Sequence, residues 1–187
     1  RAPDSGPDLL NKPVDHRPLA RNTKATLYVV ATPIGNLRDV TERARAVLGA
    51  CTMIAAEDTR VTRRLLDHWG VTVRLIALHE HNEARAAVDV LDVLAAGGDV
   101  AVVSDAGTPA ISDPGARVVA AARAAGFVVS PLPGANAAAA AVSVSGFDAP
   151  HFLFYGFLPA RAAARRAALE AVAAHPYTLV FYEAPHR

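Results

Sequence analysis

Short apolar runs, each followed by a turn of small or polar residues and then a helix-like segment, recur along the sequence. Their length and continuous apolar character are typical of strands buried on both faces of a parallel sheet. Parallel neighbours need crossover connections, so the intervening segments are expected to be helices on the two faces of the sheet. The sequence therefore predicts an α/β fold with a mostly parallel five-stranded sheet. The predicted strands are Leu27–Ala31, Cys51–Ala56, Val73–Leu78, Val100–Val103 and Phe127–Val129. The predicted helices are Thr41–Gly49, Arg60–Trp69, Glu83–Ala96, Ala116–Ala125 and Ala137–Val144.

The pattern changes after residue 147. His151–Phe157 is aromatic and alternating, a basic helix follows, and Thr178–Tyr182 is a further strand after which the chain ends. We therefore expect an N-terminal α/β domain over residues 26–147 and an incomplete second α/β lobe over residues 148–187. Residues 1–25 contain four prolines and several acids, which predicts a disordered tail.

Composition excludes several classes of protein. The net charge of +1 is unlike that of a strongly basic nucleic-acid binder, although a local basic face remains compatible with it. A single cysteine, Cys51, excludes an internal disulfide and a cysteine-based metal site. No apolar run has the roughly 18–20 residues needed to span a membrane. We expect a soluble cytoplasmic protein with no membrane and no metal.

The loop after Val103 is the first candidate site. Its residues Ala106, Gly107 and Thr108 are small, so a ligand is able to approach the backbone closely. In open α/β sheets, ligands bind at the carboxyl ends of the strands, where this loop is expected. An ordinary turn rich in small residues is the alternative. Asp113 is predicted to cap the following helix, with Pro114 at its first position.

Charged residues follow the second predicted strand. Glu57, Asp58 and Arg60 are candidates for catalysis or substrate binding. The alternative is structural: Asp58 or Thr59 caps the next helix, and Glu57 pairs with an arginine.

Histidines follow the third predicted strand. His79 and His81 would point to the same side if the strand continued, and Glu80 lies between them. No third ligand with suitable spacing follows, so a polar rim that binds substrate or moves protons is favoured over a zinc site.

Distinctive motifs occur after most of the predicted strands. They are Thr32–Leu37, Ala55–Arg60, Val103–Pro109, Ser112–Gly115, Pro131–Gly134, Tyr155–Pro159 and Phe181–Arg187. Together, in this order, they resemble the tetrapyrrole methylase superfamily, and within it the branch that methylates small-subunit ribosomal RNA. The first motif also lacks the G-x-G-x-x-G fingerprint of Rossmann dinucleotide sites.

The resemblance implies a two-lobed α/β fold, usually homodimeric, with S-adenosylmethionine in the cleft between the lobes. It implies methylation of the ribose 2′-hydroxyl of a cytidine in 16S ribosomal RNA of the small subunit. Many relatives have Gly-Pro-Cys or Gly-Pro-Ser where this chain has Gly134-Ala135-Asn136. By matching motifs, the residues expected to contact the cofactor are Pro33, Gly35, Ser104, Asp105, Ala106, Gly107, Thr108, Pro109, Ile111, Ala135 and Asn136.

A ribose hydroxyl needs a group that takes its proton, so a general base is expected. The catalytic candidates are Glu57, Asp58, Arg60, His79 and Glu183, of which Arg60 would hold a phosphate or fix a carboxylate. Glu80, Asp105 and His186 are further candidates, and the sequence does not choose among them.

The basic helix of the second lobe is the predicted RNA surface. Its candidate residues are Arg161, Arg165 and Arg166, and a solvated face is the alternative. Two rival functions stay open at this point: methylation of a tetrapyrrole precursor on the same scaffold, and a non-catalytic module that binds the cofactor or RNA.

Overall fold

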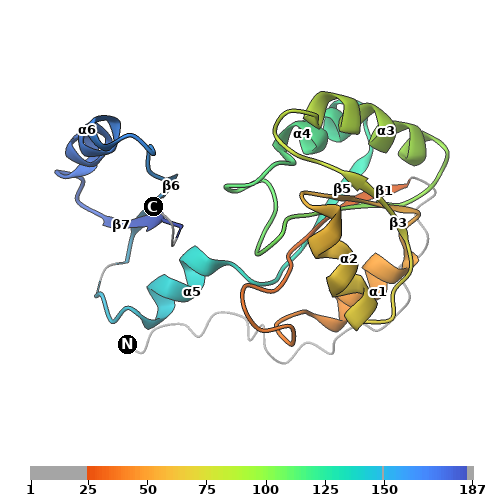
Figure 1. The fold of residues 1–187 in the computed structure, drawn as a ribbon, viewed down its shortest axis with the longest axis horizontal. Helices are drawn as coiled ribbons and strands as arrows, with labels where there is room; N and C mark the ends of the chain where they lie inside the picture. The colour runs from red at the N-terminus through yellow and green to blue at the C-terminus, as the bar shows by residue number, and fades with distance from the viewer. Residues whose placement is uncertain (1–24, 149, 185–187) are drawn as a thin grey trace, which may run out of the picture.

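The computed structural model describes residues 25–148 and 150–184. Its main part is a five-stranded parallel sheet with the strand order β3-β2-β4-β1-β5 (Figure 1). The predicted α/β class is thus confirmed. The strands are β1 (Thr26–Val30), β2 (Met53–Ala56), β3 (Arg74–Ala77), β4 (Val100–Val103) and β5 (Val128–Leu132).

Helices cover both faces of this sheet (Figure 1). Strand side chains alternate between two cores: in β2, Met53 and Ala55 belong to one, and Ile54 and Ala56 to the other. Helices α3 and α4 close the first core, and α1 and α2 close the second. Their bounds are α1 (Glu42–Ala50), α2 (Thr59–His68), α3 (Glu83–Ala95) and α4 (Ala116–Ala124).

The strand order brings distant segments of the chain together. Strand β4 lies between β2 and β1, and β1 pairs with β5 on its other side. Because all these strands run in the same direction, their following loops meet at one edge of the sheet. The motifs after the first, second, fourth and fifth strands are therefore neighbours in space.

Two local predictions need correction. Helix α4 begins at Ala116 with Gly115 as its N-cap, so Asp113 is not the cap. Gly115 has a φ of 128°, a conformation that suits glycine, and it allows the loop to turn before the helix starts. Strand β5 extends to Leu132 and includes Pro131, which an edge strand tolerates because one side of its backbone has no partner strand.

The described part of the second lobe is a two-stranded sheet with one connecting helix. Helix α5 (Ala137–Val144) leads toward it, and β6 (Phe152–Phe157) and β7 (Thr178–Tyr182) form a parallel pair connected by α6 (Ala162–Val172) (Figure 1). Both strands lie where the sequence predicts them. In the part of the chain that the structure describes, no helix is long and apolar enough to cross a bilayer. The expected tail falls almost entirely on residues 1–24, outside the described residues, whereas Ala25 is buried in the core.

Candidate functional site

Hydrogen bonds join the loops after β1, β4 and β5. The backbones of Thr32 and Gly107 bond in both directions, at 2.9 and 3.0 Å. The Thr32 hydroxyl donates to the carbonyl oxygen of Ser104 at 3.0 Å, and the Thr108 hydroxyl donates to that of Ala135 at 3.1 Å. These bonds satisfy buried polar groups and fix the three loops against one another.

Gly107 is required at this junction. Its φ of 85° lies in the left-handed region, and an added Cβ would lie 3.4 Å from the Ile34 side chain. A larger residue there would cost roughly 1–3 kcal/mol in backbone strain alone. The glycine thus allows the β4 loop to bond to Thr32 while leaving its backbone open to a ligand.

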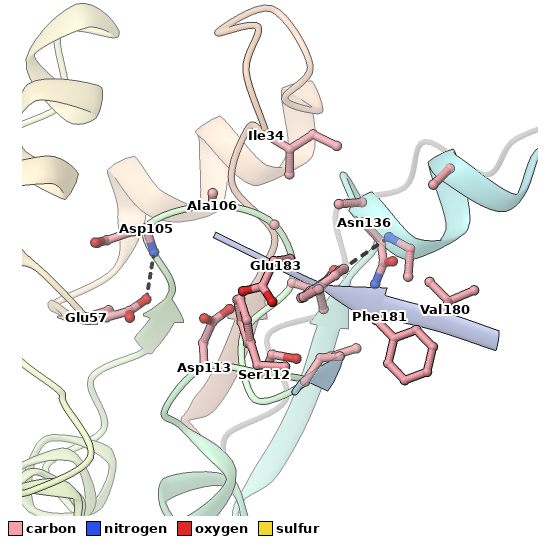
Figure 2. A pocket seen from close by; sticks show the side chains of 18 residues that line it. Ile34, Glu57, Asp105, Ala106, Ser112, Asp113, Asn136, Val180, Phe181 and Glu183 are labelled. Atoms are coloured by element: carbon pink, nitrogen blue, oxygen red, sulfur yellow. Dashed lines mark hydrogen bonds between the residues drawn. The ribbon is translucent and has the colours of Figure 1, made fainter. Parts of the chain in front are cut away.

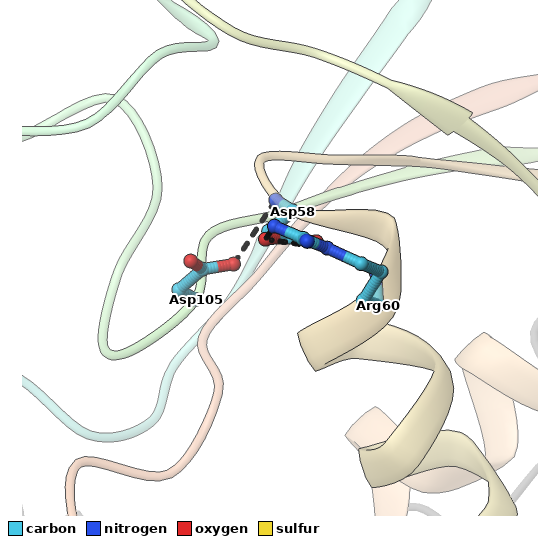
Figure 3. A network of polar contacts seen from close by, with 3 residues as sticks. All are labelled: Asp58, Arg60 and Asp105. Carbon is cyan, nitrogen blue, oxygen red and sulfur yellow. Dashed lines mark hydrogen bonds and ion pairs between the residues drawn. The ribbon is translucent and has the colours of Figure 1, made fainter.

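A second set of bonds joins the loops after β2 and β4. The backbone N–H of Asp105 donates to Glu57 Oε2 at 3.1 Å, and that of Asp58 donates to Asp105 Oδ1 at 3.0 Å (Figures 2 and 3). The two carboxylates are therefore held by the main chain of the opposite loop. This arrangement fixes their positions at the edge of the sheet.

A cavity of about 540 Å³ opens between the joined loops and the second lobe (Figure 2). We call it the inter-lobe cavity. One wall is the β4 loop at Ala106, Gly107 and Thr108, with Ile111 further along. The opposite wall comes from β6 and β7. The start of α5 contributes small side chains, namely Ala137, Ala138 and Ala141, beside Asn136.

Four carboxylates line the inter-lobe cavity, on Glu57, Asp105, Asp113 and Glu183 (Figure 2). No lysine, arginine or histidine is present among the described residues that line it. Burial raises the pKa of Glu57, Asp105 and Asp113, and neighbouring carboxylates raise each of these pKa values further. Four carboxylates without a basic side chain among the described lining residues give the cavity an acidic character, and a cationic ligand would favour their ionised forms.

Glu83 on α3 fixes the end of the loop that carries Asp113. The Glu83 side chain is buried, and its carboxylate accepts a hydrogen bond from the backbone N–H of Gly115. Arg117 lies 3.4 Å from the same carboxylate. A buried acid paired in this way fixes the end of the loop and the start of α4.

The structure brings only part of the predicted cofactor set to this cavity. Asp105, Ala106, Gly107, Thr108, Ile111 and Asn136 line it. Ser104 is buried, and its hydroxyl donates to the carbonyl oxygen of Gly107 at 3.3 Å. Ala135 contributes its carbonyl to Thr108, and Pro109 is buried without lining the cavity. Pro33 and Gly35 line a smaller neighbouring cavity.

The structure also brings only part of the predicted catalytic set to the inter-lobe cavity. Glu57 and Glu183 line the inter-lobe cavity, whereas Asp58, Arg60 and His79 do not. Asp58 is the N-cap of α2 and accepts from the backbone N–H of Arg60 at 2.8 Å, as the structural alternative predicts. The Arg60 guanidinium also binds this carboxylate at 2.6 Å and lowers its pKa (Figure 3). Asp58 and Arg60 thus form an ion pair in which each charge is balanced by the other.

His79 and His81, which were expected to form a polar rim, lie at a turn after β3 rather than on a continued strand. Strand β3 ends at Ala77, and the backbone N–H of His79 donates to Asn82 Oδ1 at 2.8 Å. His79 and His81 meet edge to face with ring centroids 6.4 Å apart, and neither they nor Glu80 line the inter-lobe cavity. Among the described residues, no cluster of three or more His, Cys, Asp or Glu is placed to hold a metal ion. His186 lies outside the described residues.

The basic residues near α6 lie on the second lobe, away from the cavity lining. Arg161 is the N-cap of α6, and Arg166 is exposed. The Arg165 guanidinium donates to the carbonyls of Pro159 and Ala160 at 3.1 and 3.2 Å. Arg165 therefore stabilises the turn before α6, and the role of this helix in RNA binding stays a prediction.

Several residues of the inter-lobe cavity are not found by sequence reasoning. The local pattern assigns Asp113 to a cap, and it does not single out Ile34, Ser112 or Tyr182 as site residues. The alanine-rich start of α5 does give a signal, because such small side chains allow close packing or a flat ligand. The Tyr182 hydroxyl accepts a 3.3 Å bond from the backbone N–H of Ala138, which joins the second lobe to α5.

Two solved structures share this fold. One is uroporphyrin-III-C-methyltransferase from Thermus thermophilus, with a TM-score of 0.55 and 20% identity, which covers 73% of this chain and 61% of that one. The other is a cobalamin biosynthetic enzyme, cobalt precorrin-4 methyltransferase, with a TM-score of 0.55 and 18% identity, which covers 73% and 59%. At this identity the likeness shows the fold alone.

Several curated proteins named "Ribosomal RNA small subunit methyltransferase I" are much more similar in sequence. The protein from Xylella fastidiosa is 55% identical over 166 residues, which are 89% of this chain and 61% of that protein. Those from Escherichia coli O157:H7 and Pseudomonas aeruginosa are 52% and 53% identical over 168 and 162 residues. These matches cover 90% and 87% of this chain and 59% and 57% of those proteins. The chain thus spans less than two thirds of the length of these relatives.

The family match covers nearly all of the described residues. The family described as "Tetrapyrrole (Corrin/Porphyrin) Methylases" matches residues 26–187, from β1 to the last residue. Together with the shared fold and the motifs at the strand ends, this match shows that the chain belongs to the tetrapyrrole methylase family.

Proposed function

We propose that this protein is an S-adenosylmethionine-dependent methyltransferase that methylates the ribose 2′-hydroxyl of a cytidine in 16S ribosomal RNA. The observation that carries the proposal is the inter-lobe cavity, with its bare β4 loop and its four carboxylates. A negatively charged cavity without a basic side chain among its described lining residues suits a ligand that carries a positive sulfonium. The names of the similar curated proteins support the choice of ribosomal RNA as substrate.

The cavity fits such a ligand in size and chemistry. Its volume of about 540 Å³ lies within the range of roughly 300–1,000 Å³ that is common for small-molecule sites. Ala106 and Gly107 leave the backbone open, and the alanines of α5 leave room for a flat ring. When bound, S-adenosylmethionine supplies a methyl group on a positively charged sulfur.

Asp105 is the proposed proton acceptor. Burial raises its pKa, which makes the ionised carboxylate a stronger base near neutral pH. Its Oδ1 is fixed by the backbone N–H of Asp58, so the carboxylate is held in place before substrate binds. Glu57 in turn accepts from the backbone N–H of Asp105, and this fixes the loop on which Asp105 lies.

The remaining parts of the proposal rest on the family and the relatives. We expect the active protein to be a homodimer that acts in the cytoplasm on the small ribosomal subunit. The second lobe, with Glu183 directly after β7, is expected to close the cavity over the cofactor.

The test is labelled methyl transfer to small ribosomal subunits from cells that lack the modification, with the full-length protein. Calorimetry with S-adenosylmethionine is run in parallel. Methyl incorporated at a cytidine 2′-oxygen is the expected result. Methylation of a tetrapyrrole precursor in place of the subunits, or cofactor binding without turnover on either substrate, would contradict the proposal.

A further inference from the structure

A second cavity adjoins the inter-lobe cavity at Asp105, which belongs to both linings. It has a volume of about 290 Å³ and lies between the β1–α1 loop and helix α2. We call it the Arg64 pocket. Its apolar lining includes Pro33, Leu37, Val61 and Leu65.

The Arg64 pocket combines apolar surface with one guanidinium, that of Arg64, beside the shared Asp105 carboxylate. Leu37 and Val61 are 47% and 38% exposed, and the exposed Arg64 lies one helical turn after Arg60. The charge of Arg60 is largely balanced by Asp58, so Arg64 is the cation that serves the pocket itself. Exposed apolar side chains provide a surface against which an unstacked base packs, and the guanidinium is able to bind its phosphate.

The two cavities differ in charge: four carboxylates line the first, whereas the second has one arginine beside the shared Asp105 carboxylate. Carboxylates in the inter-lobe cavity would repel a phosphodiester, so an RNA chain has to pass beside that cavity rather than through it. A nucleotide whose ribose contacts Asp105 is covalently joined to nucleotides on both sides. A neighbouring nucleotide would therefore lie close to Asp105, which lines both cavities. The Arg64 pocket begins at this residue.

We propose that the Arg64 pocket binds a nucleotide adjacent to the methylated one in the RNA acceptor. Its base or ribose packs on Leu37, Val61 and Leu65, and its phosphate binds the Arg64 guanidinium. This inference rests on the proposed function, since it assumes an RNA acceptor at Asp105.

The first experiment places a photoreactive benzophenone amino acid at Val61 in the full-length protein. Val88 on α3 is the matched control, because it is also an exposed helical valine, at 56%, and does not line the pocket. The probe is small ribosomal subunits that lack the modification, without added cofactor. A covalent RNA adduct from position 61, at least about fivefold above that from position 88, is expected for a specific contact.

The second experiment reverses the charge of Arg64. Arg64→Glu is expected to raise the KM for subunits by about tenfold and to reduce its salt dependence, because the side chain no longer binds a phosphate. The dissociation constant for S-adenosylmethionine should stay unchanged. Arg85→Glu on α3 is the control, since Arg85 is also an exposed helical arginine outside both linings.

The outcomes separate the two proposals. If the protein methylates subunits but position 61 gives no more RNA adduct than position 88, or gives an adduct with a ribosomal protein, the Arg64 pocket is not an RNA site. The same conclusion follows if the Arg64→Glu variant and the Arg85→Glu control have the same KM for subunits. If the wild type neither binds S-adenosylmethionine nor methylates subunits, the proposed function fails and this inference fails with it.

Discussion

The inter-lobe cavity and the Arg64 pocket share Asp105 and otherwise differ in most respects. The first is lined by four carboxylates and by small residues of the β4 loop and α5, and the second by branched apolar side chains and an arginine. The first depends on two lobes and several loops, whereas the second depends on the β1–α1 loop, helix α2 and Asp105 of the β4 loop. If both proposals hold, one sheet edge serves two ligands of opposite charge, with the sulfonium among carboxylates and the phosphate beside the Arg64 guanidinium.

Asp105 is the residue at which a substitution should affect catalysis most. Asp105→Asn keeps an oxygen that accepts from the backbone N–H of Asp58, so the loop geometry should survive. Removal of the proton acceptor is expected to reduce the methyl-transfer rate by about 10²–10⁴-fold at saturating cofactor and RNA. Single-turnover kinetics measures this, with Glu80→Gln, outside both linings, as the control. A fall of less than tenfold would exclude Asp105 as the general base.

Glu83 is expected to support the inter-lobe cavity and not the Arg64 pocket. Glu83→Ala removes the buried acceptor for the backbone N–H of Gly115, which costs about 1–3 kcal/mol of folding free energy. Because the loop with Asp113 then loosens, the affinity for S-adenosylmethionine should fall while RNA binding is preserved. Denaturant melts and calorimetry test this, and Glu83→Gln, which keeps an acceptor oxygen, should restore most of the stability. Equal decreases in affinity for both ligands would point to a general folding defect.

The pH dependence of cofactor binding should show whether the carboxylates of the inter-lobe cavity select a cationic ligand. The raised pKa values of Glu57, Asp105 and Asp113 mean that acidification from neutral pH neutralises these groups earlier than ordinary carboxylates. The affinity for S-adenosylmethionine should then fall by roughly tenfold for each carboxylate that becomes neutral beside the ligand. S-adenosylhomocysteine lacks the sulfonium charge, so its affinity should change less. Parallel pH curves for both ligands would show that cavity charge does not select the cation.

A small gain in stability is expected when Asp113 is neutralised in the protein without ligand. The pKa of Asp113 is raised in the folded state, mainly by burial, so its contribution to stability is present at low pH and is lost as the pH rises through the folded pKa. Asp113→Asn should therefore stabilise the free protein at about pH 8, by less than about 1 kcal/mol because the group is partly exposed to solvent. Thermal melts should show this gain shrinking towards about pH 4. A gain that is constant with pH would have to come from something other than charge.

Much of the fold follows from local pattern. The runs that form β2 and β4 are buried on both faces, as is typical of central strands in a parallel sheet. Thr41, the first residue of the predicted helix Thr41–Gly49, is the N-cap of α1, and its hydroxyl accepts from the backbone N–H of Ala44 at 3.0 Å. Asp113 shows the limit of such prediction: an acid before Pro114 resembles a cap, yet Gly115 takes that position because Glu83, distant in sequence, binds its N–H.

The α/β class, the strand positions, the bare β4 loop and the family can all be read from the order of residues, because they depend on periodicity and on motifs within short segments. Which polar residues act together depends instead on how the chain folds in three dimensions. The strand order places Glu57, Asp105 and Asp113 around one cavity and leaves His79 outside it. The physical reason is that burial, pairing and charge at a site come from contacts between loops far apart in the chain. The bond from the backbone N–H of Asp105 to Glu57 is one of these, and no local pattern records it.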